Sequence, residues 1–353
     1  MNAPAITRIQ ILPYPAGATE PVFLVRVTTD QGVHGIGEAC AAPGEDVAEV
    51  VEELAVQALG RPVANRNALW QAMCGAAGDW EGPPEVMSAC LSALDAAVWE
   101  AWCVGAGLPC VEAMGGRVRT ALEICLDCGE DIDAAKSAYA AGVRIFGFRL
   151  DPREQEALQR LSRLRIGLGP QALMILECSS PASGADEAVA LGQALDRLDP
   201  YWTQGLLPDG QWRELAQVRE RVAAATACGE DTLGFKRFLR PLENACADIL
   251  TPRLASVGGP SGALALSVAV GMRGLRMCVL PGSTPASALA VAHVSFARPE
   301  VYPLRITPPA LESLRQALPD AVRDGFLHLN QAPGWSGIQS IAQPLEPLAT
   351  FEA

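Results

Sequence analysis

The sequence has 353 residues, of which half are hydrophobic and 19% are charged, and its formal net charge at pH 7 is −13. This composition is typical of a compact globular protein with one large domain or two. The acidic balance argues against non-specific binding to nucleic acid or to an anionic membrane, because both need a basic surface.

The sequence also argues against a membrane protein and against a disulfide framework. The apolar window nearest in length to a membrane span, residues 263–280, contains Arg273 and Arg276. The 11 cysteines are scattered, and the C-x-x-C motif from Cys125 to Cys128 has no second pair to complete a zinc site. The first residues lack the basic start and apolar stretch of a signal peptide. We therefore expect reduced thiols and a cytoplasmic protein.

The first part of the chain predicts an α+β unit over residues 1–118. β-branched alternation and a turn at Asp30–Gly32 predict an antiparallel meander of three strands, over Ile6–Leu12, Val22–Thr28 and Val33–Glu38. The period then changes, and apolar residues at three- and four-residue spacing predict helices over 46–58, 67–74 and 84–105.

After Arg119, strand and helix patterns alternate. The candidate strands are Leu122–Asp127, Val143–Leu150, Leu173–Cys178, Tyr201–Gln204, Ala224–Gly229, Ala247–Thr251, Met277–Leu280 and Val301–Ile306. Helical segments lie between them, including one over Phe235–Ala245. Eight such strands favour a closed parallel barrel over residues 119–317. The last segment, residues 318–353, contains Asp324–Leu329 and Ala332–Trp335, and we expect it to form a strand and loop that return to the first domain.

The stretch ALMILECSS, residues 172–180, is a short apolar run that ends in Glu177. In a parallel α/β barrel, a strand that delivers an acid at its carboxyl end presents that acid to the active site. Glu177 is therefore the first candidate functional residue, and a structural salt bridge is the alternative role for it.

Several segments together resemble the enolase superfamily, in its mandelate racemase / muconate lactonizing enzyme branch. They are VFLVRVTTDQGVHGIGEA (residues 22–39), Gly142–Phe146, Cys228–Glu230, Asp248–Pro252 with Gly258–Gly259, and Asp324–Gly325 with Pro333–Gly334. The resemblance implies an α/β fold, with an N-terminal α+β capping domain and a modified TIM barrel of the (β/α)7β type. It also implies an isomerase or lyase that removes the proton α to a carboxylate, such as a racemase, a cycloisomerase or an acid-sugar dehydratase.

In that family, three carboxylates hold Mg²⁺, which stabilises the enediolate, while Lys or His bases move the proton. By resemblance, the metal ligands fall on Glu177, Gln204 and Glu230, so one carboxylate is replaced by an amide. The Lys-x-Lys motif falls on Gly147–Arg149, where glycine carries no proton and arginine is a poor base.

The remaining acid/base positions are changed as well. The aspartate of the His–Asp dyad falls on Arg253, its histidine falls near Pro281–Gly282, and the acid of the eighth strand falls on Arg305. The histidines of the chain, His34, His293 and His328, lie elsewhere. We hypothesise that Arg149, Arg253 and Arg305 replace Mg²⁺ by bidentate pairing with the two glutamates, and that their surplus positive charge holds a small carboxylate.

Other polar residues near the strand ends have two interpretations each. Asp209 and Asp231 could be substitute ligands or acids at helix starts. Cys178, Cys228 and Cys278 have no histidine placed beside them, which favours inert buried thiols. Lys236 is one of only two lysines, and a solvated helix residue is its simpler interpretation. Each arginine could instead lie on the rim of the barrel and cover apolar surface.

Three functions therefore remain open from the sequence: an isomerase or lyase with replaced groups, a non-catalytic barrel that binds a small carboxylate through arginines, and a structural or regulatory subunit. The resemblance also implies a homo-oligomer. Substrate specificity is expected to lie in the loops Tyr14–Pro21 and Cys40–Asp46.

Overall fold

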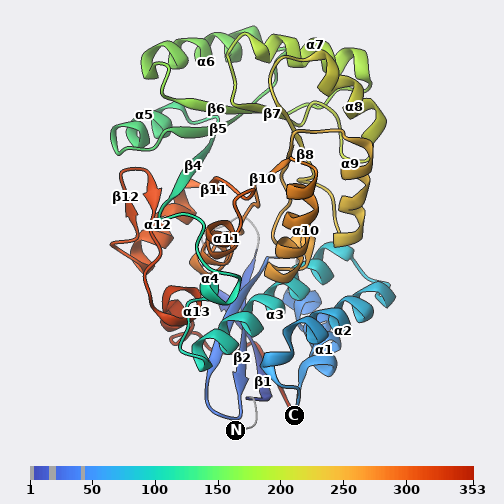
Figure 1. Cartoon of the computed structure of the whole chain (residues 1–353), viewed down its shortest axis with the longest axis vertical. Coiled ribbons are helices and arrows are strands. Elements are labelled where there is room, and N and C mark those ends of the chain that lie inside the picture. Colours follow the sequence, from blue (N-terminus) through green and yellow to red (C-terminus); the bar gives the residue numbers. More distant parts are fainter. Residues whose placement is uncertain (1–3, 16–20, 41–43) are drawn as a thin grey trace.

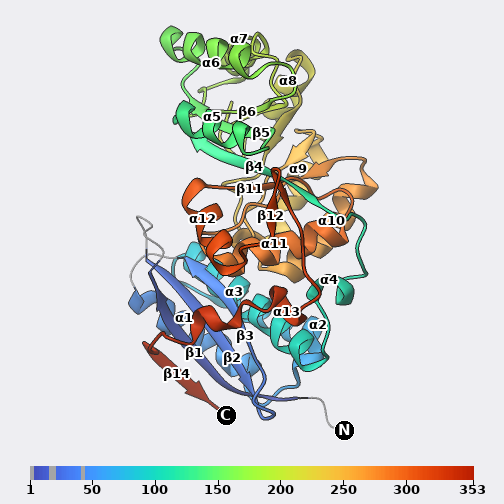
Figure 2. The ribbon, with the colours of Figure 1, turned by 90° about the vertical axis from the view of Figure 1, so that its left-hand side faces the viewer.

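A computed structural model describes residues 4–15, 21–40 and 44–353 of the chain. Parts of the two loops expected to set specificity, residues 16–20 and 41–43, lie outside the described residues. Figures 1 and 2 show a smaller N-terminal unit packed beneath a larger α/β unit, with both termini at the lower end.

The N-terminal unit, called the cap below, begins with an antiparallel meander. Its strands are β1 (Ile6–Tyr14), β2 (Val22–Thr29) and β3 (His34–Cys40). A C-terminal strand, β14 (Ala349–Glu352), completes the sheet in the order β14-β1-β2-β3. The meander predicted from the alternation of β-branched residues is confirmed.

The helices α1 (Gly44–Ala58), α2 (Arg66–Asp79) and α3 (Pro84–Gly105) follow the meander. Two glycines of β3 allow α3 to pack directly on the sheet. A Cβ atom at Gly35 or Gly37 would collide with the carbonyl oxygen of Ala97 or Ala93. The glycines in VHGIGE therefore permit a helix–sheet approach that any larger side chain would prevent.

The second unit is a closed parallel barrel. Its strands are β4 (Leu122–Gly129), β5 (Ile145–Leu150), β6 (Leu173–Cys178), β7 (Trp202–Gln204), β8 (Thr226–Cys228), β9 (Ile249–Leu250), β10 (Arg276–Met277) and β11 (Leu304–Ile306). The helices between them are α5 (Ile132–Ala140), α6 (Gln155–Leu168), α7 (Ala185–Asp196), α8 (Trp212–Arg221), α9 (Leu239–Asn244), α10 (Pro260–Met272) and α11 (Pro285–Ala297). Strand β11 pairs with β4, and a bridge from Met277 to Val301 completes the ring.

Several connections depart from the predicted ranges. The helix predicted over Phe235–Ala245 is a 3₁₀ turn, Phe235–Phe238, followed by the short helix α9. A short helix, α4 (Cys110–Ala113), links the cap to the barrel. After β11 come α12 (Pro308–Ala317) and a hairpin of β12 (Val322–Arg323) and β13 (Phe326–Leu327).

The C-terminal segment contacts both units. Strand β13 pairs with the barrel strand β4, whereas β14 pairs with β1 of the cap. Between them lies α13 (Pro333–Ser336). The buried Glu100 of α3 accepts hydrogen bonds from the backbone N–H groups of Ile36 (2.7 Å) and Trp335 (3.2 Å). One carboxyl group therefore joins the cap sheet, the cap helix and the returning segment.

The interior of the barrel is arranged in layers. An apolar layer is formed by Cys125, Ile145, Ile175, Trp202, Ala227, Ile249, Cys278 and Leu280. Side chains two residues apart on a strand point to the same face, so the next inward positions on β4, β6 and β7 are Asp127, Glu177 and Gln204. The period of the strands thus sets a polar layer on top of the apolar one, at the carboxyl ends of the strands.

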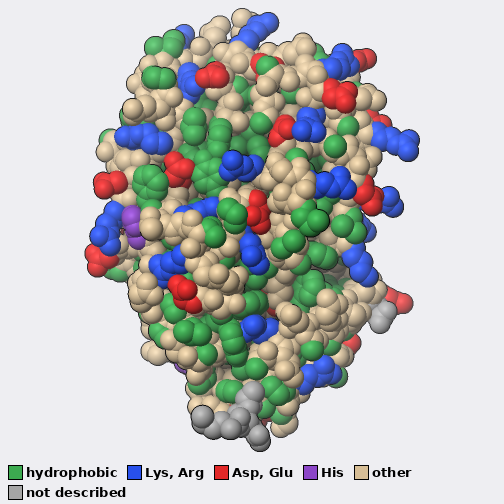
Figure 3. All heavy atoms as spheres, viewed as in Figure 1, with side chains coloured by type: hydrophobic (Ala, Val, Ile, Leu, Met, Phe, Trp, Pro, Cys, Tyr) green, Lys and Arg blue, Asp and Glu red, His purple; other side chains and the backbone are tan. Residues whose placement is uncertain are grey.

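No helix among the described residues is long and apolar enough to cross a membrane. Figure 3 shows acidic and basic side chains interspersed with apolar ones over the face that it displays.

Candidate functional site

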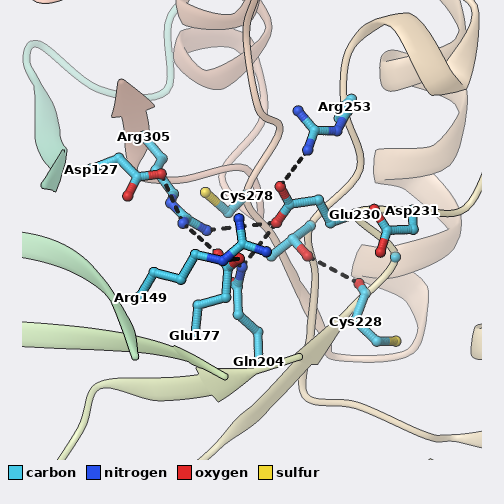
Figure 4. A network of polar contacts seen from close by, with 12 residues as sticks. Asp127, Arg149, Glu177, Gln204, Cys228, Glu230, Asp231, Arg253, Cys278 and Arg305 are labelled. Atoms are coloured by element: carbon cyan, nitrogen blue, oxygen red, sulfur yellow. Dashed lines mark hydrogen bonds and ion pairs between the residues drawn. The ribbon is translucent and has the colours of Figure 1, made fainter. Parts of the chain in front are cut away.

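The polar layer at the carboxyl end of the barrel contains three acids, one amide and three arginines (Figure 4). Asp127 lies on β4, Glu177 on β6, Gln204 on β7 and Arg305 on β11. Arg149 lies on β5, whereas Glu230 and Arg253 follow β8 and β9. The structure brings together all six residues that the sequence selected, because the carboxyl ends of parallel barrel strands converge.

Gln204 lies between the two glutamates and acts as a donor to both. Its Nε2 is 2.9 Å from Glu177 Oε2 and 2.9 Å from Glu230 Oε2. The indole Nε1 of Trp202 donates to Gln204 Oε1 at 3.2 Å. Because an indole N–H can only donate, this contact fixes the amide oxygen toward Trp202 and its NH₂ group toward the carboxylates.

Arg305 supplies the buried positive charge of the site. Its Nη2 is 2.8 Å from Asp127 Oδ2 and 3.0 Å from Glu177 Oε2, and its Nη1 is 3.9 Å from Glu230 Oε2. Burial acts to lower the pKa of this guanidinium, but the surrounding negative groups, Asp127 foremost, raise the pKa above its ordinary value. Arg305 therefore stays charged and neutralises several acids at once.

Arg149 and Arg253 lie at the open end of the layer. Arg149 Nε is 3.3 Å from Glu177 Oε1, and Arg253 Nη2 is 2.6 Å from Glu230 Oε1. Their side chains are 59% and 52% exposed. The two parallel hydrogen bonds of bidentate pairing, expected from the sequence, are not found in these pairs within the described part of the chain. Both guanidinium groups thus keep donors available for another partner.

The expected surplus of positive charge is also not found. Asp127 was not among the residues selected from the sequence, and with it three acids face three arginines. Asp231 adds a further carboxylate to the lining. Burial raises the pKa of Glu230, although Arg305 and Arg253 oppose this effect. Asp127 could have been found from the sequence. It follows Cys125 by two residues on β4, just as Glu177 follows Ile175 by two residues on β6, so both acids point into the barrel.

Two of the positions at or near which the family's bases fall are glycines here, Gly147 and Gly282, and neighbouring groups crowd both. A Cβ atom at Gly147 would lie 3.0 Å from Asp127 Oδ1 and 3.4 Å from Arg305 Nε. A Cβ atom at Gly282 would collide with the carboxyl group of Glu38, which comes from cap strand β3. Glu38 accepts hydrogen bonds from the N–H groups of Ser283 and Thr284, both at 2.7 Å, near the start of α11. Other groups thus fill the space on which the Lys and His bases would depend.

The same residues do not fit a magnesium ion in this arrangement. Mg²⁺ needs oxygen ligands about 2.0–2.1 Å away in octahedral geometry. Between the two glutamates, however, stand an amide NH₂ and a guanidinium, both of which are hydrogen-bond donors. Within the described ranges, no group of three His, Cys, Asp or Glu side chains is placed to hold a metal ion.

The other candidate residues have structural partners. Asp209 accepts hydrogen bonds from the N–H groups of Gly229 (3.0 Å) and Asp231 (3.1 Å) and from Thr232 Oγ1 (2.8 Å), so it holds the loop that carries Glu230. Burial raises the pKa of the Cys278 thiol to about 12, and also raises the pKa of Cys178.

Cys228 Sγ lies 3.6 Å from Cys246 Sγ, and this contact together with burial raises the pKa of Cys228. His293 Nδ1 accepts from the Val111 N–H at 2.9 Å, and burial lowers the pKa of this imidazole to about 3. His34 lies on β3 and His328 follows β13, so both are on elements outside the polar layer.

A hollow of about 130 Å³ opens above the polar layer and is called the barrel hollow below. Its lining includes Arg149, Glu177, Glu230, Asp231 and Arg253. The hollow therefore presents guanidinium donors and carboxylate acceptors side by side.

Two family models match the chain. Residues 12–115 match the mandelate racemase / muconate lactonizing enzyme N-terminal domain, and residues 130–339 match the enolase C-terminal domain-like model. A D-galactonate dehydratase of Ralstonia nicotianae is 27% identical over 293 residues, which cover 78% of this chain and 75% of the relative. A D-galactonate dehydratase family member of Catenulispora acidiphila is 24% identical and covers 94% of this chain and 85% of its own length.

Solved structures of the same fold include a mandelate racemase/muconate lactonizing enzyme-like protein of Rubrobacter xylanophilus, with a TM-score of 0.87, 21% identity and 95% of each chain covered. A putative galactarate dehydratase of Agrobacterium radiobacter, solved with sodium and L-malate bound, has a TM-score of 0.83, 19% identity, and coverage of 94% of this chain and 92% of that one. The cap, the barrel and the two matching models agree, and the chain belongs to the mandelate racemase / muconate lactonizing enzyme family of the enolase superfamily.

Proposed function

We propose that this chain is a metal-independent member of its family that binds a small hydroxylated carboxylate in the barrel hollow without performing the family's proton transfer. The observation that carries the proposal is the position of Gln204. Its NH₂ group donates to Glu177 and to Glu230, between the two acids that would otherwise share a cation.

The hydrogen-bond donors around Glu177 and Glu230 explain why a metal ion would not bind there. Glu177 and Glu230 have their charge offset by Arg305, Arg149 and Arg253, and their oxygens accept hydrogen bonds from within the protein. A divalent cation would have to displace a buried guanidinium from its position and reverse the Gln204 amide against the Trp202 donor. Both changes cost free energy that two carboxylates would recover only in part.

The lost proton transfer follows from the change at the family's base positions, because no Lys or His is among the described residues that line the hollow. A general base must lie within hydrogen-bond reach of the proton that it takes and must exchange protons near neutral pH. Arg149 and Arg253, which line the hollow, carry guanidinium groups, and a guanidinium is a poor general base. The site therefore supports recognition better than it supports turnover.

A hydroxylated carboxylate suits the mixed charge of the hollow. Its carboxylate can accept hydrogen bonds from the free donors of Arg149 and Arg253, and its hydroxyl groups can donate to Glu177, Glu230 or Asp231. The relatives named as galactonate dehydratases favour acid sugars as the first ligands to test. Cytoplasmic location and assembly into a homo-oligomer remain predictions.

The test measures thermal denaturation with D-galactonate, galactarate and the uncharged polyol galactitol, each with excess Mg²⁺ or with EDTA. The acid sugars should raise the melting temperature equally in both conditions, and galactitol should not. The double variant Arg149→Gln/Arg253→Gln should lose this effect. The matched variant Arg240→Gln/Arg323→Gln, which removes two exposed arginines elsewhere, should keep it.

Turnover is tested separately, by proton NMR of each acid sugar incubated with the protein in D₂O. No exchange of the α-proton is expected. Exchange, or stabilisation that requires Mg²⁺, would contradict the proposal and favour an isomerase or lyase. Absence of any ligand effect would contradict it in favour of a structural or regulatory subunit.

A further inference from the structure

A second hollow lies between the cap and the barrel and is called the cap–barrel groove below. Its volume is about 470 Å³, and it is bounded by α2 and the start of α3 on one side and by residues 233–237 and 256–258 on the other. Figure 1 shows these cap helices beneath α9 and α10. None of the described residues that line this groove also lines the barrel hollow, so the two hollows are separate.

The groove has a preformed aromatic wall. Trp70 Nε1 donates to the Gly258 carbonyl oxygen at 2.8 Å, and the Trp70 ring meets Phe235 edge to face, with centroids 5.6 Å apart. These contacts hold both rings in place and satisfy the indole N–H. Trp80, Met87 and Leu91 extend the apolar surface. Trp70, Met87 and Leu91 are almost fully buried, so the exposed part of the wall comes mainly from Phe235 and Trp80, and it suits a flat apolar body.

The rim of the groove carries two neighbouring cations. Lys236 and Arg237 are exposed, and neither side chain forms an ion pair or hydrogen bond with any residue that the structure describes. Lys236 is one of two lysines in a chain with a net charge of −13. The other, Lys136, pairs with Asp133 at 2.9 Å. An unpaired double charge beside an apolar wall favours a ligand with an anionic end.

We propose that the cap–barrel groove binds an aromatic carboxylate. The ring packs against the aromatic wall at Phe235 and Trp80, and the carboxylate pairs with Lys236 and Arg237 at the rim. This site is independent of the barrel hollow and of the function proposed for it.

The experiment titrates phenylacetate into the full chain by isothermal titration calorimetry. Acetate lacks the ring and 2-phenylethanol lacks the carboxylate, so both should bind more weakly. Lys236→Gln/Arg237→Gln should weaken phenylacetate binding roughly tenfold, because two charge-assisted hydrogen bonds are lost. The matched variant Lys136→Gln/Arg240→Gln should bind like the wild type, as should Arg149→Gln/Arg253→Gln, which separates this site from the barrel hollow.

Equal affinity of all three compounds for the wild type, or no measurable binding, would overturn the proposal. So would a dimer whose formation excludes the compound, because a second copy would then be the occupant of the groove.

Discussion

Arg305 and Asp127 form an ion pair, Nη2 to Oδ2 2.8 Å, where the first and last strands of the barrel meet. Arg305 is 4% exposed and also reaches Glu177 and Glu230. The pair therefore joins barrel closure to the polar layer. A cation supplied by a side chain is covalently part of the fold, whereas a bound metal ion depends on its concentration in solution.

Replacing Arg305 by glutamine should be strongly destabilising. Arg305→Gln leaves Asp127, Glu177 and Glu230 close together without their shared buried charge. We expect the free energy of unfolding to fall by about 3–5 kcal/mol, the usual cost of removing one partner from a buried pair. Urea denaturation measures this change. As a control, Arg8→Gln breaks the exposed pair with Glu352 and should cost about 1 kcal/mol or less. Equal effects of the two substitutions would contradict the role given to Arg305.

Gln204→Glu should convert the site back toward a metal site. The new carboxylate replaces a donor that lies 2.9 Å from both Glu177 and Glu230, so three acids repel one another. Without divalent ions, the variant should melt at a lower temperature than the wild type. Excess Mg²⁺ should recover part of this loss, because a third carboxylate restores an oxygen ligand set.

Calorimetric melting with Mg²⁺ and with EDTA checks this expectation. Gln193→Glu, on the exposed face of α7, adds the same charge outside the site and should respond to neither. If Mg²⁺ stabilised the wild type as much as Gln204→Glu, the account of Gln204 as the donor that keeps a metal ion from the two glutamates would be wrong.

The sequence predicted the fold and the convergence of Glu177, Gln204 and Glu230 because both follow from regular periods. Strand alternation sets which residues point inward, and parallel strands bring their carboxyl ends together. The partners of these residues were harder to predict. The pairing of Arg305 with Asp127 depends on how the two edges of the barrel meet. Glu38 reaches Ser283 and Thr284 across 245 and 246 residues of sequence, and no local pattern encodes such a contact.

Glu38 should be essential to the docking of the cap on the barrel. It is buried, and its oxygens accept from the N–H groups of Ser283 and Thr284 and from Thr284 Oγ1, the last at 2.6 Å. Glu38→Ala leaves these donors without partners near the start of α11, and we expect a loss of about 3 kcal/mol or more in the free energy of unfolding. Glu38→Gln keeps one acceptor oxygen and should cost less. Urea denaturation that ranked the two variants in the opposite order would contradict this role.

Asp95 of α3 should make stability depend on pH. Its Oδ1 accepts from Ser261 Oγ and its Oδ2 from the Ser261 N–H, both at 2.7 Å, and the carboxyl group is 1% exposed. Burial raises its pKa from 3.8 to about 7, although the hydrogen bonds from Ser261 and the charge of Arg66 oppose this effect. Since the folded pKa lies above the unfolded one, the stability linked to Asp95 is fully present below the unfolded pKa and is lost as pH rises through about 7.

Asp95→Asn should therefore lose this part of the pH dependence. The variant's free energy of unfolding, measured relative to wild type by urea denaturation at several pH values, should rise by a few kcal/mol at most between about pH 4 and pH 7. Glu100, whose pKa burial raises to about 8, is present in both proteins and cancels in the difference. Asp320→Asn, at an exposed position, should give a difference that does not change with pH. A flat difference for Asp95→Asn as well would mean that Asp95 titrates near its ordinary pKa, and that burial does not hold its proton in the folded state.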